Sequence, residues 1–105
     1  MKIAITSTGN STDSIIDSRF GRCVYFVVFD TESKSMEFIP NPFKEAEEDA
    51  GPSSVELIAS RNVCKIVSGE FGAKIKPMLD SLKIQMIVIK DSEKKVSDII
   101  NLLNR

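Results

Sequence analysis

The chain has 105 residues, a length typical of one compact domain, so we expect a single domain over residues 1–105. Hydrophobic residues make up 42% and charged residues 28%, which excludes a disordered or fibrous chain. With 14 basic and 15 acidic residues the net charge is −1, so we expect neither nucleic acid nor an anionic membrane as a partner.

The residue types that the chain lacks exclude several classes of site. It contains no His, which excludes Ser-His-Asp and Cys-His nucleophilic sites and zinc hydrolase centres. Its 2 cysteines, Cys23 and Cys64, form no Cys-x-x-Cys motif, and we interpret both as reduced thiols. No apolar run is long enough for a signal peptide or a membrane span, which indicates a cytoplasmic protein.

Three strands are expected in the first forty residues. The β-branched run KIAIT at 2–6 predicts a strand, and a long polar loop follows it. The almost continuously apolar run CVYFVVFD at 23–30 predicts a strand that is buried on both faces. The alternation of Met36 and Phe38 with polar residues predicts an antiparallel partner at the edge of a hairpin.

An acidic stretch separates this hairpin from the rest of the chain. From Lys44 to Glu56, one Lys against five carboxylates gives a net charge of −4, and we expect a solvated loop over 41–51. Ser53 and Glu56 have the spacing of a capping box, which predicts a helix over 53–61.

The second half alternates strands with helices. The runs at 64–68 and 84–89 are short, apolar and β-branched, as in the interior of a parallel sheet. Apolar residues at helical spacing predict helices over 74–82 and 93–103. Pro77 requires a late start for the first of these helices, and Asp91 and Ser92 are candidate caps for the second.

These elements have the order βββαβαβα, which predicts an α/β fold with a mixed five-stranded sheet and three helices. Right-handed crossovers make the strands at 2–6, 64–68 and 84–89 parallel, with the hairpin extending the sheet on one side. Ligands bind such sheets beyond the carboxyl ends of the parallel strands, so we expect the loops after the first and fourth strands to face each other.

The loop after the first strand contains candidate anion ligands. Arg19 and Arg22 flank Gly21, so two guanidinium groups and bare backbone amides can meet an anion there, next to Ser18. The alternative is a structural turn in which these Arg residues pair with carboxylates such as Asp13 or Asp17. Cys23 follows directly, and the two Arg residues would lower its pKa and favour a thiolate that binds iron. The alternative for Cys23 is a thiol that only fills the core.

The loop after the fourth strand contains the second set of candidates. Gly69 and Gly72 permit close approach of a ligand to the backbone, and Lys74 adds a mobile positive charge. Glu70 opposes anion binding, and a glycine turn between a strand and a helix is common without any ligand.

Two other readings fit the residues poorly. The run TSTGNST at 6–12 is similar to the phosphate loop of flavodoxins, but the chain after it leads into a hairpin strand, so we do not expect a flavin or phosphate-binding module. A sheet of this order is similar to that of ribonuclease H, but the strand at 2–6 has no carboxylate to hold the paired metal ions of a nuclease.

The run SRFGRCVYF at 18–26 resembles the dinitrogenase iron-molybdenum cofactor biosynthesis family of the NifX type. The likeness continues through Asn41-Pro42, Ala50-Gly51, ASRNV at 59–63 and GEFGAK at 69–74, and it covers nearly the whole chain. The resemblance implies a ribonuclease-H-like fold without a nuclease site, and binding of iron-sulfur clusters that are precursors of the nitrogenase cofactor. Asp49 stands where many members have His, and Gly72-Ala73 replaces a usual Gly-Pro.

We therefore expect a non-enzymatic protein that holds an anionic iron-sulfur cluster or iron-molybdenum cofactor precursor between the two loops. The expected binding residues are Ser18, Arg19, Gly21, Arg22, Gly69, Gly72 and Lys74, with Cys23 as a metal ligand. The expected partner is a protein that donates or accepts the metallocluster. The alternative is a small cytosolic protein-interaction module without a cofactor.

Overall fold

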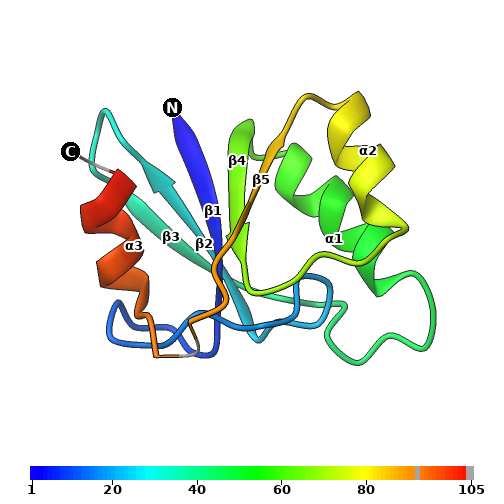
Figure 1. The fold of residues 1–105 in the computed structure, drawn as a ribbon, viewed down its shortest axis with the longest axis horizontal. Coiled ribbons are helices and arrows are strands. Elements are labelled where there is room, and N and C mark those ends of the chain that lie inside the picture. The colour runs from blue at the N-terminus through cyan, green and yellow to red at the C-terminus, as the bar shows by residue number, and fades with distance from the viewer. Residues whose placement is uncertain (92, 104–105) are drawn as a thin grey trace.

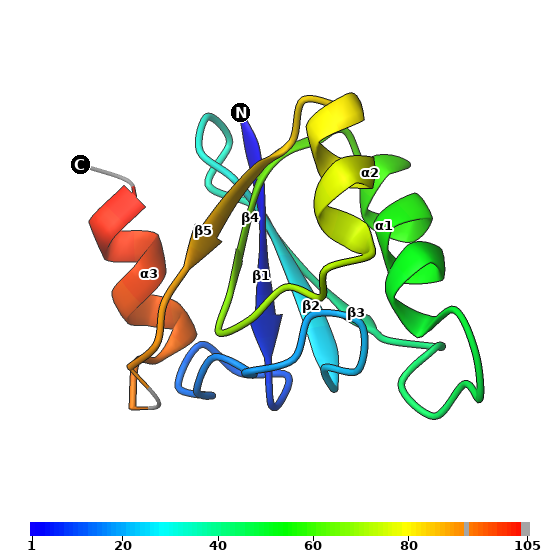
Figure 2. The same cartoon turned by 45° about the vertical axis from the view of Figure 1, so that its right-hand side comes forward.

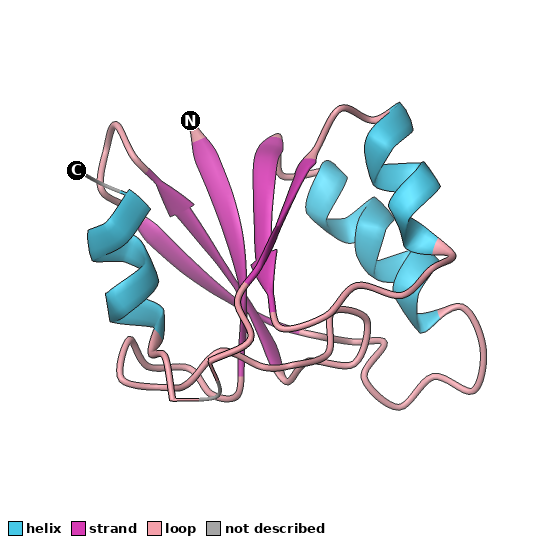
Figure 3. Cartoon of the chain, viewed as in Figure 1, coloured by secondary structure: helices cyan, strands magenta, loops and turns pink. Residues whose placement is uncertain are grey.

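The computed structural model describes residues 1–91 and 93–103 and shows one mixed sheet with helices on both faces (Figures 1 and 3). In chain order the elements are β1 (Lys2–Ser7), β2 (Tyr25–Asp30), β3 (Met36–Pro40), α1 (Ala50–Ala59), β4 (Val63–Ser68), α2 (Ile75–Ser81), β5 (Gln85–Val88) and α3 (Val96–Leu103). This confirms the expected α/β class and the order βββαβαβα. None of the helices in the described ranges has the length and apolar character that crossing a membrane requires.

The five strands lie in the order β3-β2-β1-β4-β5. β1 pairs in parallel with β4, and β4 in parallel with β5, whereas β2 runs antiparallel to both β1 and β3. The chain therefore leaves β1 toward one side of the sheet and leaves β4 toward the other. The carboxyl ends of these two neighbouring strands are the position at which α/β sheets bind ligands.

Both faces of the central strands β1 and β2 are buried, and the alternation of side chains along them separates two cores. In β1, Ala4 points toward α1 and α2 while Ile3 and Ile5 point toward α3, which lies on the opposite face (Figure 2). In β2, Phe26 belongs to the same core as Ala4, and Val27 belongs to the same core as Ile3 and Ile5. Because each side is covered by helices, the central strands consist of continuous apolar runs, and each fully buried aliphatic or aromatic side chain contributes about 1.5–3 kcal/mol.

The start of β2 differs from the prediction by two residues. The strand begins at Tyr25 rather than Cys23, because the backbone groups of Cys23 and Val24 form hydrogen bonds outside the strand ladder. The Val24 N–H donates to the Asp17 carboxylate at 3.3 Å, and the Cys23 carbonyl accepts a hydrogen bond from the Asn41 side chain at 3.0 Å. The ladder with β3 therefore starts with the pair of Tyr25 and Pro40.

The predicted capping box at Ser53 and Glu56 is wrong, since α1 begins at Ala50. Asp49 precedes the helix in a left-handed conformation with a φ of 60° and makes no side-chain cap. The Ser53 N–H instead donates to the Asp49 carbonyl at 2.9 Å, so Ser53 already lies within the first turn. Pro52 fits this earlier start because the first turn needs no N–H at that position.

The other two helices are shorter than predicted at their amino ends. α2 starts at Ile75, which leaves Pro77 in the first turn as expected. α3 starts at Val96 rather than 93, because the Asp91 side chain accepts the Glu93 N–H at 2.9 Å and forms a turn instead of a helix cap. Asp98 accepts the Lys95 N–H at 2.9 Å and closes the first turn. The other candidate cap, Ser92, lies outside the described residues.

Candidate functional site

The loops after β1 and β4 pack directly against each other at the carboxyl edge of the sheet (Figure 1). The Asp17 carbonyl accepts the Thr6 hydroxyl at 2.7 Å and the Gly69 N–H at 3.3 Å. A Cβ atom added to Gly69 would lie 2.6 Å from the Cα atom of Ser18, so glycine is required there for close packing of the loops.

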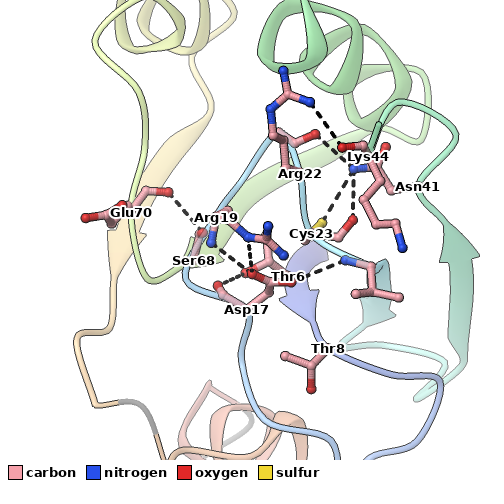
Figure 4. A network of polar contacts seen from close by, with 12 residues as sticks. Thr6, Thr8, Asp17, Arg19, Arg22, Cys23, Asn41, Lys44, Ser68 and Glu70 are labelled. Carbon is pink, nitrogen blue, oxygen red and sulfur yellow. Dashed lines mark hydrogen bonds and ion pairs between the residues drawn. The ribbon is translucent and has the colours of Figure 1, made fainter. Parts of the chain in front are cut away.

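The Asp17 side chain organises the loop that contains the two Arg residues (Figure 4). One carboxylate oxygen accepts the Arg19 N–H at 3.1 Å and its Nε–H at 3.3 Å, and the other accepts the Val24 N–H at 3.3 Å. Asp17 is only 4% exposed, whereas the Arg19 side chain is 56% exposed. Arg19 is thus held at its Nε while the outer part of its guanidinium group remains accessible.

A cavity of about 430 Å³ opens between these loops and the start of α1; we call it the cationic pocket. Its basic lining residues are Arg19, Arg22 and Lys74, and its acidic ones are Asp49 and Glu70. The remaining lining residues are apolar or glycine: Phe20, Gly21, Ala50, Gly51, Pro52, Gly72, Ala73 and Ile75. Among the expected binding residues, the structure thus brings Arg19, Gly21, Arg22, Gly72 and Lys74 together.

Arg22 connects the cationic pocket to the acidic loop over 41–49. Its Nη1 group donates to the Lys44 carbonyl at 3.1 Å (Figure 4). It also donates to the Ala46 carbonyl at 2.8 Å, and the two bonds hold the loop beside the pocket. The Nε and Nη2 groups of Arg22 donate to no residue that the structure describes. Arg22 therefore combines a structural contact with donors that a ligand can use.

Ser18 and Gly69, the other expected binding residues, lie in a neighbouring cavity of about 530 Å³, which we call the adjacent hollow. Lys90 from the segment after β5 also lines this cavity. Arg19 and Glu70 line both the adjacent hollow and the cationic pocket, so they form the boundary between the two.

Comparison with known families shows what kind of protein carries this site. The sequence model of the dinitrogenase iron-molybdenum cofactor family matches residues 1–105. The chain belongs to this family. The resemblance of the run at 18–26 is thereby confirmed. A comparison with curated protein sequences finds no match.

Solved structures share the fold of this family member. The apo form of the orange protein from Desulfovibrio gigas superposes with a TM-score of 0.89 at 24% identity, over 97% of this chain and 85% of that chain. A putative NifB protein from Thermotoga, assigned to the DUF35 family, gives 0.82 at 25% identity, over 97% and 85%. A putative dinitrogenase from Methanocaldococcus jannaschii gives 0.61 at 23% identity, over 96% and 88%.

The start of α1 is a part of this family member's pocket that the sequence analysis missed. Ala50 and Gly51 line the cationic pocket, and the first amides of a helix have no acceptor within the helix. The α1 dipole therefore adds positive potential to that of the basic side chains. Pro52 was the sequence signal for this helix start, because Pro is favoured in the first turn of a helix and excluded from its interior.

Asn41 is a second residue that sequence reasoning passed over. It is 8% exposed, and its amide group donates to the carbonyls of Gly21 and Cys23, each at 3.0 Å. Its side-chain oxygen accepts the Phe43 N–H at 2.9 Å. Asn41 thus joins the acidic loop to the loop that carries Arg19 and Arg22. The Asn41-Pro42 pair of the family pattern was the available signal.

The expected lowering of the Cys23 pKa is wrong. Cys23 is 0% exposed, and burial raises the pKa of its thiol well above the ordinary range, with the negative charge of Asp17 adding to the effect. The Arg residues do not offset this, because Arg19 is paired with Asp17 itself. Cys64 lies at the far end of β4, where its thiol contacts the Lys2 carbonyl at 3.5 Å. Neither thiol lines the cationic pocket.

The donors in the pocket fit an anion and do not fit a bare metal ion. No group of three or more Cys, Asp or Glu side chains within the described ranges is arranged to hold a metal. Guanidinium, ammonium and backbone N–H groups instead bind negatively charged oxygen or sulfur atoms. A metal-containing ligand must therefore bring its own inner ligands.

Proposed function

We propose that the chain is a non-catalytic carrier that binds an anionic iron-sulfur cluster, or a precursor of the iron-molybdenum cofactor, in the cationic pocket. The cluster is cargo, and a donor and an acceptor protein complete the transfer. One observation carries the proposal: Arg19, Arg22, Lys74 and the start of α1 converge on one cavity that contains no thiol. A volume of about 430 Å³ lies in the range of small-molecule sites.

The residues of the pocket have distinct roles in this proposal. Arg22 offers its Nε and Nη2 donors, and Arg19 and Lys74 supply exposed positive charge. Gly72 leaves room for the cargo, since no atom lies within 4 Å of a Cβ added there. Gly21 instead approaches the backbone of α1. Cys23 is not a ligand in this proposal, because its buried thiol retains its proton at neutral pH.

Weak, charge-based binding suits a carrier. Coordination by several protein thiolates would make the cargo hard to release, whereas contacts from charges and amides can be replaced by the ligands of an acceptor protein. The family to which the chain belongs is named for the nitrogenase cofactor, which is a metallocluster. The proposed cargo is consistent with that family membership.

The test is anaerobic titration with a synthetic tetranuclear iron-sulfur cluster that carries small thiolate ligands, read by bound iron and visible absorption. The double variant Arg19→Ala/Lys74→Ala removes two charges from the pocket, and we expect it to bind the cluster about tenfold more weakly than the wild type. Arg22 is left unchanged in this variant because its substitution also releases the acidic loop.

The matched control is Lys83→Ala/Lys94→Ala, which removes two exposed charges away from the cationic pocket and the adjacent hollow. We expect its affinity to stay within about twofold of the wild type. A wild type that binds no cluster, or two double variants that bind it equally, would contradict the carrier function. The protein-interaction module without a cofactor would then be the better account.

A further inference from the structure

Glu70 lies where three surface cavities meet. It lines the cationic pocket and the adjacent hollow, and it also lines a third cavity of about 420 Å³ between the loop after β4 and the end of β5. Lys76 and Lys90 contribute to the third cavity, together with Val88. An anion that enters any of these three cavities therefore comes close to Glu70.

The charges around Glu70 are mostly positive. Arg19 and Lys74 share the cationic pocket with it, Lys90 shares the adjacent hollow, and Lys76 shares the third cavity. Asp17, Asp49 and Asp91 also line these cavities. Within the described residues, the Glu70 carboxylate forms no ion pair with any of the four basic residues, and Arg19 pairs with Asp17 instead.

The backbone fixes the position of this charge. The Ser68 hydroxyl donates to the Glu70 carbonyl at 3.0 Å, and the Gly69 N–H donates to the Asp17 carbonyl at 3.3 Å. In Figure 4 the Glu70 side chain extends away from Asp17 and Arg19, with its carboxylate free of both. The residue that carries the carboxylate is therefore anchored to the same network that positions Arg19.

We propose that Glu70 weakens anion binding at this site in proportion to the charge of the anion, which keeps a multiply charged ligand releasable. The inference rests on the proposed function, since it concerns the same site. The Coulomb energy between the Glu70 carboxylate and a bound anion is proportional to the charge of the anion, as is the attraction from the four cations. Glu70 therefore removes an amount of binding energy that grows with the charge of the anion, so a multiply charged anion is held less tightly than it would be by the cations alone.

The test compares Glu70→Gln with the wild type for three inorganic probes, nitrate, sulfate and pyrophosphate, which differ in charge. Affinities come from titrations followed by the backbone amide signals of Gly21, Gly69 and Gly72 in ¹H–¹⁵N spectra at low ionic strength. We expect the variant to bind sulfate about three- to tenfold more tightly than the wild type, nitrate with a smaller gain and pyrophosphate with a larger one. Added salt must reduce all three gains.

Glu93→Gln is the matched control, because it makes the same change of charge at an exposed residue outside the three cavities. We expect no dependence on probe charge in this variant. Equal gains for all three probes, a Glu93→Gln variant that behaves like Glu70→Gln, or an absence of binding to every protein would each overturn the inference.

Cluster uptake by the same proteins separates this inference from the proposed function. A wild type that takes up the cluster while Glu70→Gln shows no charge-dependent gain contradicts only the role of Glu70. If no protein takes up the cluster but the gain rises with probe charge, the role of Glu70 is supported and the carrier function is contradicted.

Discussion

At the scale of single residues, we expect the substitution of Asn41 to destabilise the protein more than that of any other polar side chain of the site. Replacing Asn41 with Ala leaves the carbonyls of Gly21 and Cys23 and the N–H of Phe43 without these hydrogen bonds. Because these groups lie in a partly or fully buried region, we expect a loss of about 2–3 kcal/mol in the free energy of unfolding. Urea denaturation of the wild type and of Asn41→Ala measures this difference in the free energy of unfolding.

Asn10→Ala is the control for this prediction, since Asn10 is exposed in the loop after β1. We expect its free energy of unfolding to stay within about 0.5 kcal/mol of the wild type. Equal stabilities of the two variants would show that the hydrogen bonds of Asn41 do not hold the loops together.

Cys23 gives the protein a predictable pH dependence at alkaline pH. The pKa of its thiol is raised in the folded state by burial and by Asp17, whereas the unfolded chain releases this proton near about pH 8.5. The contribution of the Cys23 thiol to the free energy of unfolding is therefore fully present below about pH 8.5. It decreases as the pH rises toward the pKa of the thiol in the folded state. The free energy of unfolding should fall by at most about 1.4 kcal/mol per pH unit in this range.

Cys23→Ala removes this contribution, so the variant should lose less stability than the wild type when the pH rises from 8 to 10. Urea denaturation at several pH values measures both slopes, and Cys64 is present in both proteins. If the free energy of unfolding falls equally with pH in the two proteins, the Cys23 thiol ionises as readily in the folded protein as in the unfolded chain, which contradicts the prediction.

At the scale of elements, the loop after β1 and the start of α1 meet through glycine. A Cβ atom on Gly21 would lie 2.8 Å from both the Cα and the N atom of Gly51, and backbone atoms cannot move away at low cost. We expect Gly21→Ala to lower the free energy of unfolding by about 1–3 kcal/mol. It should also weaken cluster binding, because it pushes α1 away from the pocket.

Gly72→Ala is the comparison, since no atom lies within 4 Å of an added Cβ and the residue does not have a positive φ. We expect an unchanged or slightly higher stability for this variant. A Gly72 variant that is as unstable as the Gly21 variant in urea denaturation would contradict the packing argument.

At the scale of the whole molecule, the sheet topology is compatible with a nuclease but the side chains at its carboxyl edge are not. β1 has no carboxylate, and the nearby Asp17 is occupied by Arg19 and Val24. Two-metal hydrolysis requires carboxylates that bridge both ions. We expect no cleavage of RNA or DNA with added magnesium or manganese, measured on gels across purification fractions. Cleavage that co-purifies with the protein would contradict this prediction.

The sequence by itself determined the sheet and the helical faces. The apolar runs around Ile5, Phe26 and Ile66 are long and β-branched or aromatic, and such local patterns specify a strand wherever both of its faces are covered. The helical spacing of Ile75 and Leu79 likewise specifies a buried stripe. The two Arg residues and the glycines of the loops were also visible, because they follow the strands predicted at 2–6 and 64–68.

Only the tertiary structure decided how these residues are used. The start of α1 depends on Asp49 and Pro52 and overrides the local signal of Ser53 and Glu56, since the Ser53 N–H is already bonded within the helix. The environment of Cys23 depends on burial by segments that lie far away in the sequence, which outweighs the adjacent Arg charges. The start of α1 and the raised pKa of Cys23 depend on burial and on neighbours that folding brings together. A local sequence pattern carries no information about either burial or such neighbours.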